Sequence, residues 1–390
     1  MEEKSINKEI IEPFKKISDS RCACDVKIPV FHVVIITLCA LMSRIEKIEE
    51  IAQFAEGRAT WFEKHFGIGQ IPSESSLRRI LGIMNPMEVG VASLSLIRKL
   101  LQVEGDIVAI DGKAIRTSDR LKGFANKLRI LSAYETETSV TVGQVEVGDK
   151  TNEITAMLDL LELLNLEGRI VTADAMHCQW KTCQRIVEKG GDYVIQVKGN
   201  QQGLYEDIKD FMDDEIATNS EDIILSESEE KNHGRWEKRQ CYISRNVEWL
   251  ENREVWSSIQ LLIAMDRTTI RDGKQTQERS YYISSLVGTA AHVLRIIREH
   301  WQIESLHWSL DVVFHEDGCR ERDTRVQMNL NIFRKLVLAL HRNYVKKLKD
   351  SGAPKTKNKS NKSSMIDCLL NPDHMLKIFG QEIEGDLKLG

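Results

Sequence analysis

Residues 107–113 read IVAIDGK, a short apolar run that ends in Asp-Gly-Lys. An apolar run of this length that stops at a turn signal is typical of a buried β-strand. A second run, residues 169–174, reads RIVTAD and ends in an aspartate in the same way. We therefore expect two buried strands, with Asp111 near the end of the first and Asp174 just after the second.

The sequence around these runs predicts the rest of an α/β core. The further expected elements are, in chain order, strands at Leu128–Tyr134 and Ser139–Val147, a helix at Asn152–Leu164, a helix ending at Glu188, and a strand at Tyr193–Val197. The order β-β-β-α-β-α-β is typical of a ribonuclease-H-like core. Such a core presents one carboxylate on its first strand and another at the end of its fourth, where Asp111 and Asp174 stand.

The first hundred residues follow a helical pattern instead. Apolar positions recur with helical spacing in residues 30–43, 48–66 and 76–84, and Ser73 is a candidate N-cap for the last of these helices. We expect residues 1–100 to form a helical N-terminal domain. Its 14 basic and 13 acidic residues are nearly balanced, so DNA binding cannot be read from its charge.

The second half of the chain interrupts the core with an insertion. Residues 205–232 hold eleven acidic residues against two lysines, which predicts a solvated helix and loop, and strands are expected at 235–244, 259–268 and 275–284. The expected organisation is therefore a first part of the core at 101–204, an acidic helix and β-rich insertion at 205–287, a second, helical part of the core at 288–344, and a basic linker with a terminal helix at 345–390.

Composition limits the class of protein. With 390 residues, 42% hydrophobic and 29% charged, the chain can bury a large core, which excludes a disordered or fibrous protein. The formal net charge of −5 argues against a surface that is basic throughout, but it allows a local basic surface. Eight cysteines without doubled C-x-x-C spacing fit reduced thiols, and the longest apolar run, residues 29–42, is too short to cross a bilayer. We expect a cytoplasmic location and no membrane partner.

A third group of candidate residues lies near residue 300. His300, Glu304, His307 and Asp311 are spaced so that one helix over residues 290–313 would present all four on one face. Together with Asp111 and Asp174, Glu304 would supply the hard oxygen ligands that two divalent cations need to promote displacement at a phosphodiester.

Other interpretations of the same residues stay open. Taken alone, Asp111 could be a turn residue, Asp174 the N-cap of the next helix, and the residues near 300 a polar helix face. A zinc hydrolase built on His300, Glu304 and His307 is a further alternative.

The same residues carry a resemblance to a known family. The chain resembles the H-repeat-associated (ISAs-type) insertion-sequence transposases, which are of the DDE type. The matching segments run nearly the length of the chain: FKKISDSR (14–21), IPSESSLRRIL (71–81), AIDGKAIR (109–116), LSAYETETSVTVGQVEV (131–147), KTNEITAMLDLLELLNLEGRIVTADAMHCQ (150–179), GGDYVIQVKGNQ (190–201), HGRWEKR (233–239) and REHWQIESLHWSLDVVFHED (298–317). The chain departs from the family after Glu304. Members of the family often have Asn at the next position and one more residue before Leu-His-Trp, whereas this chain has Ser305 followed directly by Leu306.

The resemblance implies an enzyme that cleaves DNA at the ends of an insertion sequence and transfers the cleaved strand into target DNA. It implies Asp111, Asp174 and Glu304 as the catalytic and metal-binding acids, with two Mg²⁺ or Mn²⁺ ions as cofactors and a homodimer on DNA as a possible assembly. A nuclease on the same fold, or a catalytically inactive or domesticated DNA-binding descendant, remains an alternative.

Several cations and histidines could assist such a site. Lys198, Arg235 and Lys238 are candidates for contacts with DNA phosphates. His300 and His307 are candidates for orienting a metal ligand or the scissile phosphate. The helical N-terminal region and the basic residues after 342 are expected to contact DNA, mainly through phosphates.

Overall fold

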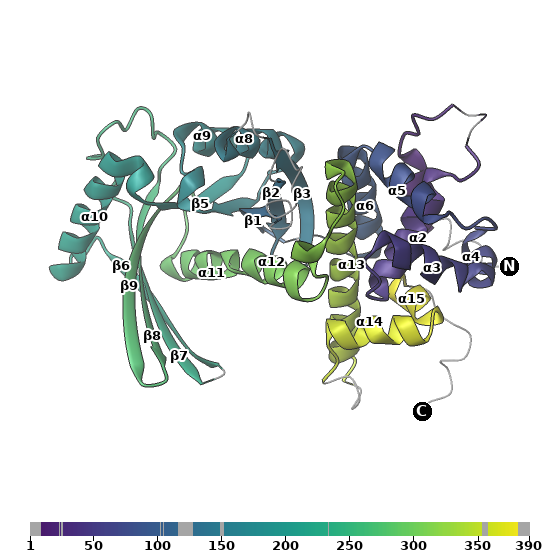
Figure 1. Cartoon of the computed structure of the whole chain (residues 1–390). Coiled ribbons are helices and arrows are strands. Elements are labelled where there is room, and N and C mark those ends of the chain that lie inside the picture. Colours follow the sequence, from purple (N-terminus) through teal and green to yellow (C-terminus); the bar gives the residue numbers. More distant parts are fainter. Residues whose placement is uncertain are drawn as a thin grey trace.

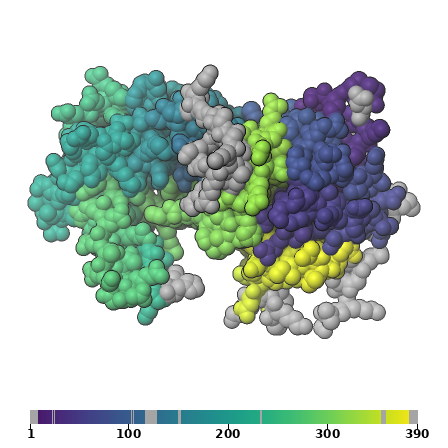
Figure 2. Space-filling view, in the orientation of Figure 1, coloured from purple at the N-terminus to yellow at the C-terminus, as the bar shows by residue number. Residues whose placement is uncertain are grey.

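The structure is a computed structural model of mixed α/β type, with one large sheet and many helices (Figure 1). It describes residues 9–22, 24, 26–101, 103, 105–115, 128–148, 152–232, 234–352 and 358–380. The sheet and its covering helices form one half of an elongated molecule, and the N-terminal and C-terminal helices form the other half (Figure 2).

Nine strands form a single sheet within the described residues, in the order β3-β2-β1-β4-β5-β9-β8-β7-β6. Strands β1, β4 and β5 are parallel to one another, and the remaining neighbours are antiparallel. The bounds are β1 (Ile107–Ala114), β2 (Arg129–Glu135), β3 (Val140–Val147), β4 (Ile170–Ala173), β5 (Asp192–Val197), β6 (Ile224–Asn232), β7 (Arg235–Ser244), β8 (Leu261–Arg271) and β9 (Lys274–Ser284). Every strand that the sequence predicts is confirmed to within a few residues.

Helices cover both faces of the sheet because its strands are apolar on both sides. Val108 and Ile110 pack with α8 (Glu153–Leu163) and α9 (Trp180–Glu188) on one face. Ala109, which points the other way, packs with α12 (Gln302–Val312). Alternation along β1 therefore sends Asp111 to the face of α12, since it lies two residues after Ala109.

The longest helix, α13 (Thr324–Asp350), joins the two halves of the molecule (Figure 1). It is buried over most of its length and shares one core with the N-terminal and C-terminal helices. These helices are α2 (Val30–Met42), α3 (Ile48–Glu56), α4 (Ala59–Phe66), α5 (Glu74–Ile83), α6 (Pro86–Leu100), α14 (Asn361–Leu370) and α15 (Asp373–Ile378). The side chain of Ser73 caps α5 as predicted, accepting a hydrogen bond from the backbone N–H of Ser76.

The predicted solvated helix and loop at 205–232 is wrong in its second half. After α10 (Gln202–Ala217) the chain forms the edge strand β6, which pairs with β7. The acidic residues of β6 face basic residues of β7: Glu227 contacts Lys238 at 3.1 Å and Glu230 contacts Arg239 at 3.7 Å. Opposite charges across neighbouring strands stabilise the pair, so the composition alone was misleading.

Two predicted helix boundaries also change. The helix predicted at 48–66 is divided into α3 and α4, and the basic residues that follow 344 begin on α13 rather than in a linker. The middle of that predicted linker, residues 353–357, lies outside the described residues.

Among the described helices, none is by itself both long and apolar enough to span a membrane. By length and composition only, the bent pair α5 and α6, which meet at 94°, passes that test together.

Gly105 should tolerate no side chain, because a Cβ there would overlap the carboxylate of Glu135. Glu135 is buried and accepts hydrogen bonds from the backbone N–H groups of Glu137 (2.7 Å) and Thr138 (3.0 Å), so it cannot easily move. We expect Gly105→Ala to lower the free energy of unfolding by about 1–3 kcal/mol. The matched Gly90→Ala, in open space on α6, should raise it by about 0.5–1 kcal/mol. Urea denaturation measures the free energy of unfolding of both variants. Equal stability of the two variants would contradict this prediction.

Candidate active site

The two aspartates lie at neighbouring positions of the parallel strands β1 and β4: Asp111 is in the middle of β1, and Asp174 directly follows the end of β4. The register pairs Ala109 with Thr172 and Ile110 with Ala173, so Asp111 and Asp174 are the next residues along each strand. Side chains two residues apart on a strand share a face, and Thr172 reaches the helical residue His300 on the side where α12 packs. The fold therefore directs both carboxylates toward the α12 side of the sheet.

Asp111 is three-quarters buried, and two other carboxylates act on it. Burial is the main cause that raises the pKa of Asp111 to about 6, and the nearby charges of Asp174 and Glu304 also contribute to this rise. One carboxylate oxygen accepts a hydrogen bond from the backbone N–H of Gly112 at 2.7 Å, and the other lies 3.4 Å from Nδ1 of His307. Asp174 and Glu304 therefore both lie within electrostatic reach of Asp111.

Asp174 is held by His300, the last residue of helix α11 (Ala290–His300). Nε2 of His300 lies 3.5 Å from its carboxylate, while Nδ1 of the same ring forms a 2.9 Å hydrogen bond with the hydroxyl of Thr172. Contact with His300 is the main reason why the pKa of Asp174 falls below its usual value, and Lys198 lowers it too. Asp174 begins the short helix η3 (Ala175–His177), as the N-cap interpretation predicts, but its side chain makes no capping hydrogen bond there.

Glu304 lies in the first turn of α12 and is exposed. The single helix predicted over 290–313 is wrong: α11 (Ala290–His300) ends before Trp301, and α12 begins after it. The ψ angle of Trp301 is −9°, far from the −42° of a regular α-helix, which interrupts the hydrogen-bond ladder at this residue. His300 and His307 nevertheless both face the aspartates, one from each helix.

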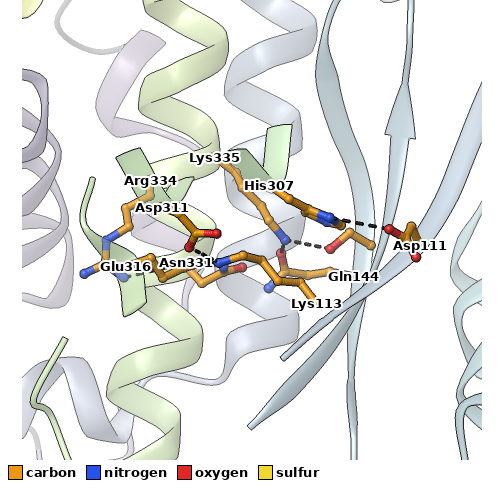
Figure 3. A network of polar contacts seen from close by, with 10 residues as sticks. Asp111, Lys113, Gln144, His307, Asp311, Glu316, Asn331, Arg334 and Lys335 are labelled. Atoms are coloured by element: carbon orange, nitrogen blue, oxygen red, sulfur yellow. Dashed lines mark hydrogen bonds and ion pairs between the residues drawn. The ribbon is translucent and has the colours of Figure 1, made fainter. Parts of the chain in front are cut away.

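Behind Asp111 lies a buried network of charged side chains (Figure 3). Lys113, two residues along β1, donates to Asp311 of α12 at 2.6 Å and to Glu316 of η5 (Glu316–Gly318) at 2.9 Å. Glu316 is fully buried and also accepts from Asn331 (2.8 Å) and Arg334 (3.4 Å) of α13. The network therefore ties the strand that carries Asp111 to α12, which carries Glu304.

A second buried cation completes this region. Lys335 of α13 donates 2.7 Å hydrogen bonds to Ser132 and Gln144, and Ser132 is the residue opposite Asp111 in the β1–β2 register. Burial lowers the pKa of Lys335 to about 7. Burial, with the positive charges of Lys335 and Lys113, also lowers the pKa of His307 to about 3, so this imidazole is neutral near pH 7.

The other candidate cations divide into two groups. Lys198, at the end of β5, is exposed and close enough to influence Asp174. Arg235 and Lys238 lie on β7 and are paired with Glu237 and Glu227. The described contacts bring neither of them to the three acids.

The carboxylates of Asp111, Asp174 and Glu304 are chemically suited to bind a divalent cation, although they do not form a complete coordination site in this structure. Within the described ranges, no three His, Cys, Asp or Glu side chains lie close enough together to hold a metal ion. Asp111 and Asp174 each contact a histidine instead. Carboxylate oxygens are nevertheless what Mg²⁺ and Mn²⁺ prefer, and the mutual repulsion that raises the pKa of Asp111 is what a bound cation would relieve.

Several residues of this region escaped the sequence analysis. Lys113 had a usable signal, because residues i and i+2 of a strand share a face and Asp111 was already a candidate. His177 is buried beside Asp174, and burial lowers its pKa to about 4. Glu316 and Lys335 had weaker signals, since their roles depend on partners about 200 residues away.

Comparisons with known proteins agree on one family. The chain matches the family described as Transposase DDE domain over residues 103–340, and a family described as DDE_Tnp_1-associated over residues 11–96. It is 33% identical over 325 residues to the "H repeat-associated putative transposase YhhI" of Escherichia coli strain K12, covering 81% of this chain and 85% of that protein. It is 31% identical over 342 residues to the "Putative transposase YncI" of Escherichia coli O157:H7, covering 85% and 87%.

Among solved structures, a piggyBac transposase synaptic complex with hairpin DNA aligns with a TM-score of 0.42 and 12% identity, covering 97% of this chain and 84% of that chain. That likeness is too low to support a further statement. The family matches span most of the described core and N-terminal helices, and the relatives span most of the chain. The chain therefore belongs to the DDE transposase family, alongside H-repeat-associated relatives.

Proposed function

We propose that this transposase cleaves DNA at the ends of an insertion sequence and transfers the cut strand to target DNA, with Asp111, Asp174 and Glu304 as its catalytic acids. The observation that carries the proposal is that Asp111 and Asp174 directly follow the paired residues Ile110 and Ala173 of the parallel strands β1 and β4, with Glu304 close enough to perturb Asp111. The strand order β3-β2-β1-β4-β5, with β1, β4 and β5 parallel, supports a ribonuclease-H-like core as the catalytic unit.

The three acids would hold Mg²⁺ or Mn²⁺, and two such ions supply Lewis-acid activation of the attacking and leaving oxygens at phosphorus. The protein's own contribution is positioning. His300 and His307 hold the two aspartates until the metal ions bind, and the Lys113–Asp311 ion pair keeps α12 against β1. The exposed Lys198 next to Asp174 is placed to contact a phosphate of the bound strand. No side chain needs to form a covalent bond with DNA.

The partners follow from the same chemistry. The substrates are the two DNA ends of the element and a target duplex, and bringing two ends together favours a homodimer on DNA. The helical N-terminal region, residues 1–100, would recognise the ends, while residues 101–204 and 288–344 would form the catalytic core around the β-rich insertion at 205–287.

The test uses the wild-type protein and a linear duplex that carries the inverted repeat flanking its gene. We expect strand cleavage at the repeat that requires Mg²⁺ or Mn²⁺, followed by joining of the new 3′ end to a target plasmid. Cleavage without joining would favour a nuclease. Binding without cleavage under either cation would favour an inactive descendant. Either result would overturn the proposal.

A further inference from the structure

A second feature of the molecule is a cleft where α6, α13 and the β2–β3 turn meet. Its volume is about 770 Å³. Three distant parts of the sequence line it: the end of α6, the turn at 137–139 and the last turns of α13. The cleft is therefore built by the fold and is separate from the three acids.

The cleft is rich in positive charge. Five cations line it, namely Arg98 and Lys99 of α6 and Arg342, Lys346 and Lys347 of α13, against the two acids Glu137 and Asp350. This is the reverse of the whole chain, whose net charge is −5. A concentration of one sign of charge in a concave surface focuses the field and attracts a polyanion.

Most of these cations have no acidic partner. Arg98, Lys99, Lys346 and Lys347 are exposed. By contrast, many other exposed cations pair with neighbouring carboxylates, as Arg185 does with Glu162 at 2.6 Å. Within the described part of the chain, no carboxylate lies within ion-pair distance of these four. The cleft therefore presents cations that are free to neutralise an outside anion.

The fifth cation connects the cleft to the candidate active site. Arg342 donates to the hydroxyl of Tyr134 at 2.7 Å, to that of Ser309 at 3.1 Å, and to the backbone carbonyl of Ser305 at 3.5 Å. Ser305 directly follows Glu304 on α12. An extended anion that lay in the cleft would thus lead toward the helix that carries the third candidate acid.

We propose that this cleft binds the sugar-phosphate backbone of duplex DNA and guides the duplex toward α12. The proposal rests on the proposed function, which makes duplex DNA the substrate. It adds the surface that would hold the duplex through its phosphates. Contacts with DNA phosphates hold a duplex independently of base sequence in other DNA-binding proteins. It also brings together the two regions that are expected to contact DNA, because the end of α6 and Lys346 and Lys347 of α13 line one surface.

The test compares the wild-type protein with the fourfold variant Arg98→Gln, Lys99→Gln, Lys346→Gln and Lys347→Gln. Binding of a fluorescent duplex is measured by anisotropy in EDTA, between about 50 and 200 mM salt. Each lost phosphate contact makes the slope of log K against log [salt] less negative by about 0.9, so the slope should change by about three to four. The matched control is Lys231→Gln with Lys274→Gln, exposed lysines of the insertion, which should leave the slope unchanged.

A second measurement needs no variant. Wild-type protein is treated with a lysine-acetylating ester with and without duplex DNA, and DNA should protect Lys99, Lys346 and Lys347 but not Lys231 or Lys274. An unchanged slope, or equal protection of both sets, overturns the cleft proposal even if wild-type protein cleaves DNA. Protection and a changed slope without any Mg²⁺-dependent cleavage would instead support the cleft and defeat the proposed function.

Discussion

Replacing Asp111 with Asn is expected to lower Mg²⁺-dependent cleavage of an element end by at least about two orders of magnitude, the scale on which loss of one preorganised electrostatic group lowers kcat. Asp174→Asn and Glu304→Gln should do the same. Each change removes a negative charge and keeps the shape of the side chain. The side chain then binds a divalent cation more weakly, but no cavity is opened. Cleavage is measured with a labelled duplex, and DNA binding in EDTA should stay close to that of the wild type.

The control variants for this series carry the same chemical change elsewhere. Asp159 of α8 and Glu221 before β6 are exposed, so Asp159→Asn and Glu221→Gln should cleave like the wild type. Full cleavage by any of the three site variants would remove that residue from the site. Loss of folding can be separated from loss of chemistry, because thermal unfolding of the site variants should remain cooperative.

Glu316→Gln is expected to destabilise the protein by about 3–5 kcal/mol, the cost of breaking a buried ion pair by removing one partner. Glu316 is fully buried and is the acidic partner of Lys113 and of Arg334, which is itself only 2% exposed. Removing its charge takes away the ion pair that the buried Arg334 makes, and it leaves Lys113 with Asp311 as its acidic partner. Urea denaturation measures the change. The control Glu321→Gln removes an acid that pairs with Arg78 nearer the surface, and it should cost at most about 1 kcal/mol.

The same residue predicts how stability depends on pH. Burial alone would raise the pKa of Glu316, but attraction by Lys113 and Arg334 outweighs it and lowers the pKa to about 2. In the unfolded state the pKa of Glu316 is near its ordinary value of 4.5, so the unfolded state binds the proton more readily than the folded state. The contribution of Glu316 to the free energy of unfolding is therefore complete above about pH 4.5. It is lost as the pH falls toward 2. The wild type should therefore lose stability more steeply than Glu316→Gln over this range, and parallel curves would contradict the assignment.

The sequence was sufficient for the strands of the core because their signals are local. The apolar runs before Asp111 and Asp174 each predict a strand without knowledge of its neighbours, although β1 continues past Asp111 to Ala114, where it pairs with β2. The start of α6 also has a local sequence signal. Pro86 occupies the first turn of α6, and Asn85 accepts a hydrogen bond from the N–H of Met87.

Features that depend on distant partners could not be predicted. β6 forms despite its acidic residues because Lys238 and Arg239 of β7 form ion pairs with Glu227 and Glu230 across the two strands. The interruption at Trp301 is a backbone geometry that the helical periodicity around it does not reveal. The basic cleft exists only because folding brings Arg98 and Lys346 to the same surface, although they are far apart in the chain.

The most direct test of the three-acid site is a crystal structure of the protein grown with an element-end duplex and Mn²⁺, with the metal located by its anomalous scattering. We expect manganese bound by carboxylate oxygens of Asp111, Asp174 and Glu304, at about 2.0–2.3 Å, with the aspartates turned away from His300 and His307. Manganese bound elsewhere, with the aspartates still in contact with those histidines, would contradict the site.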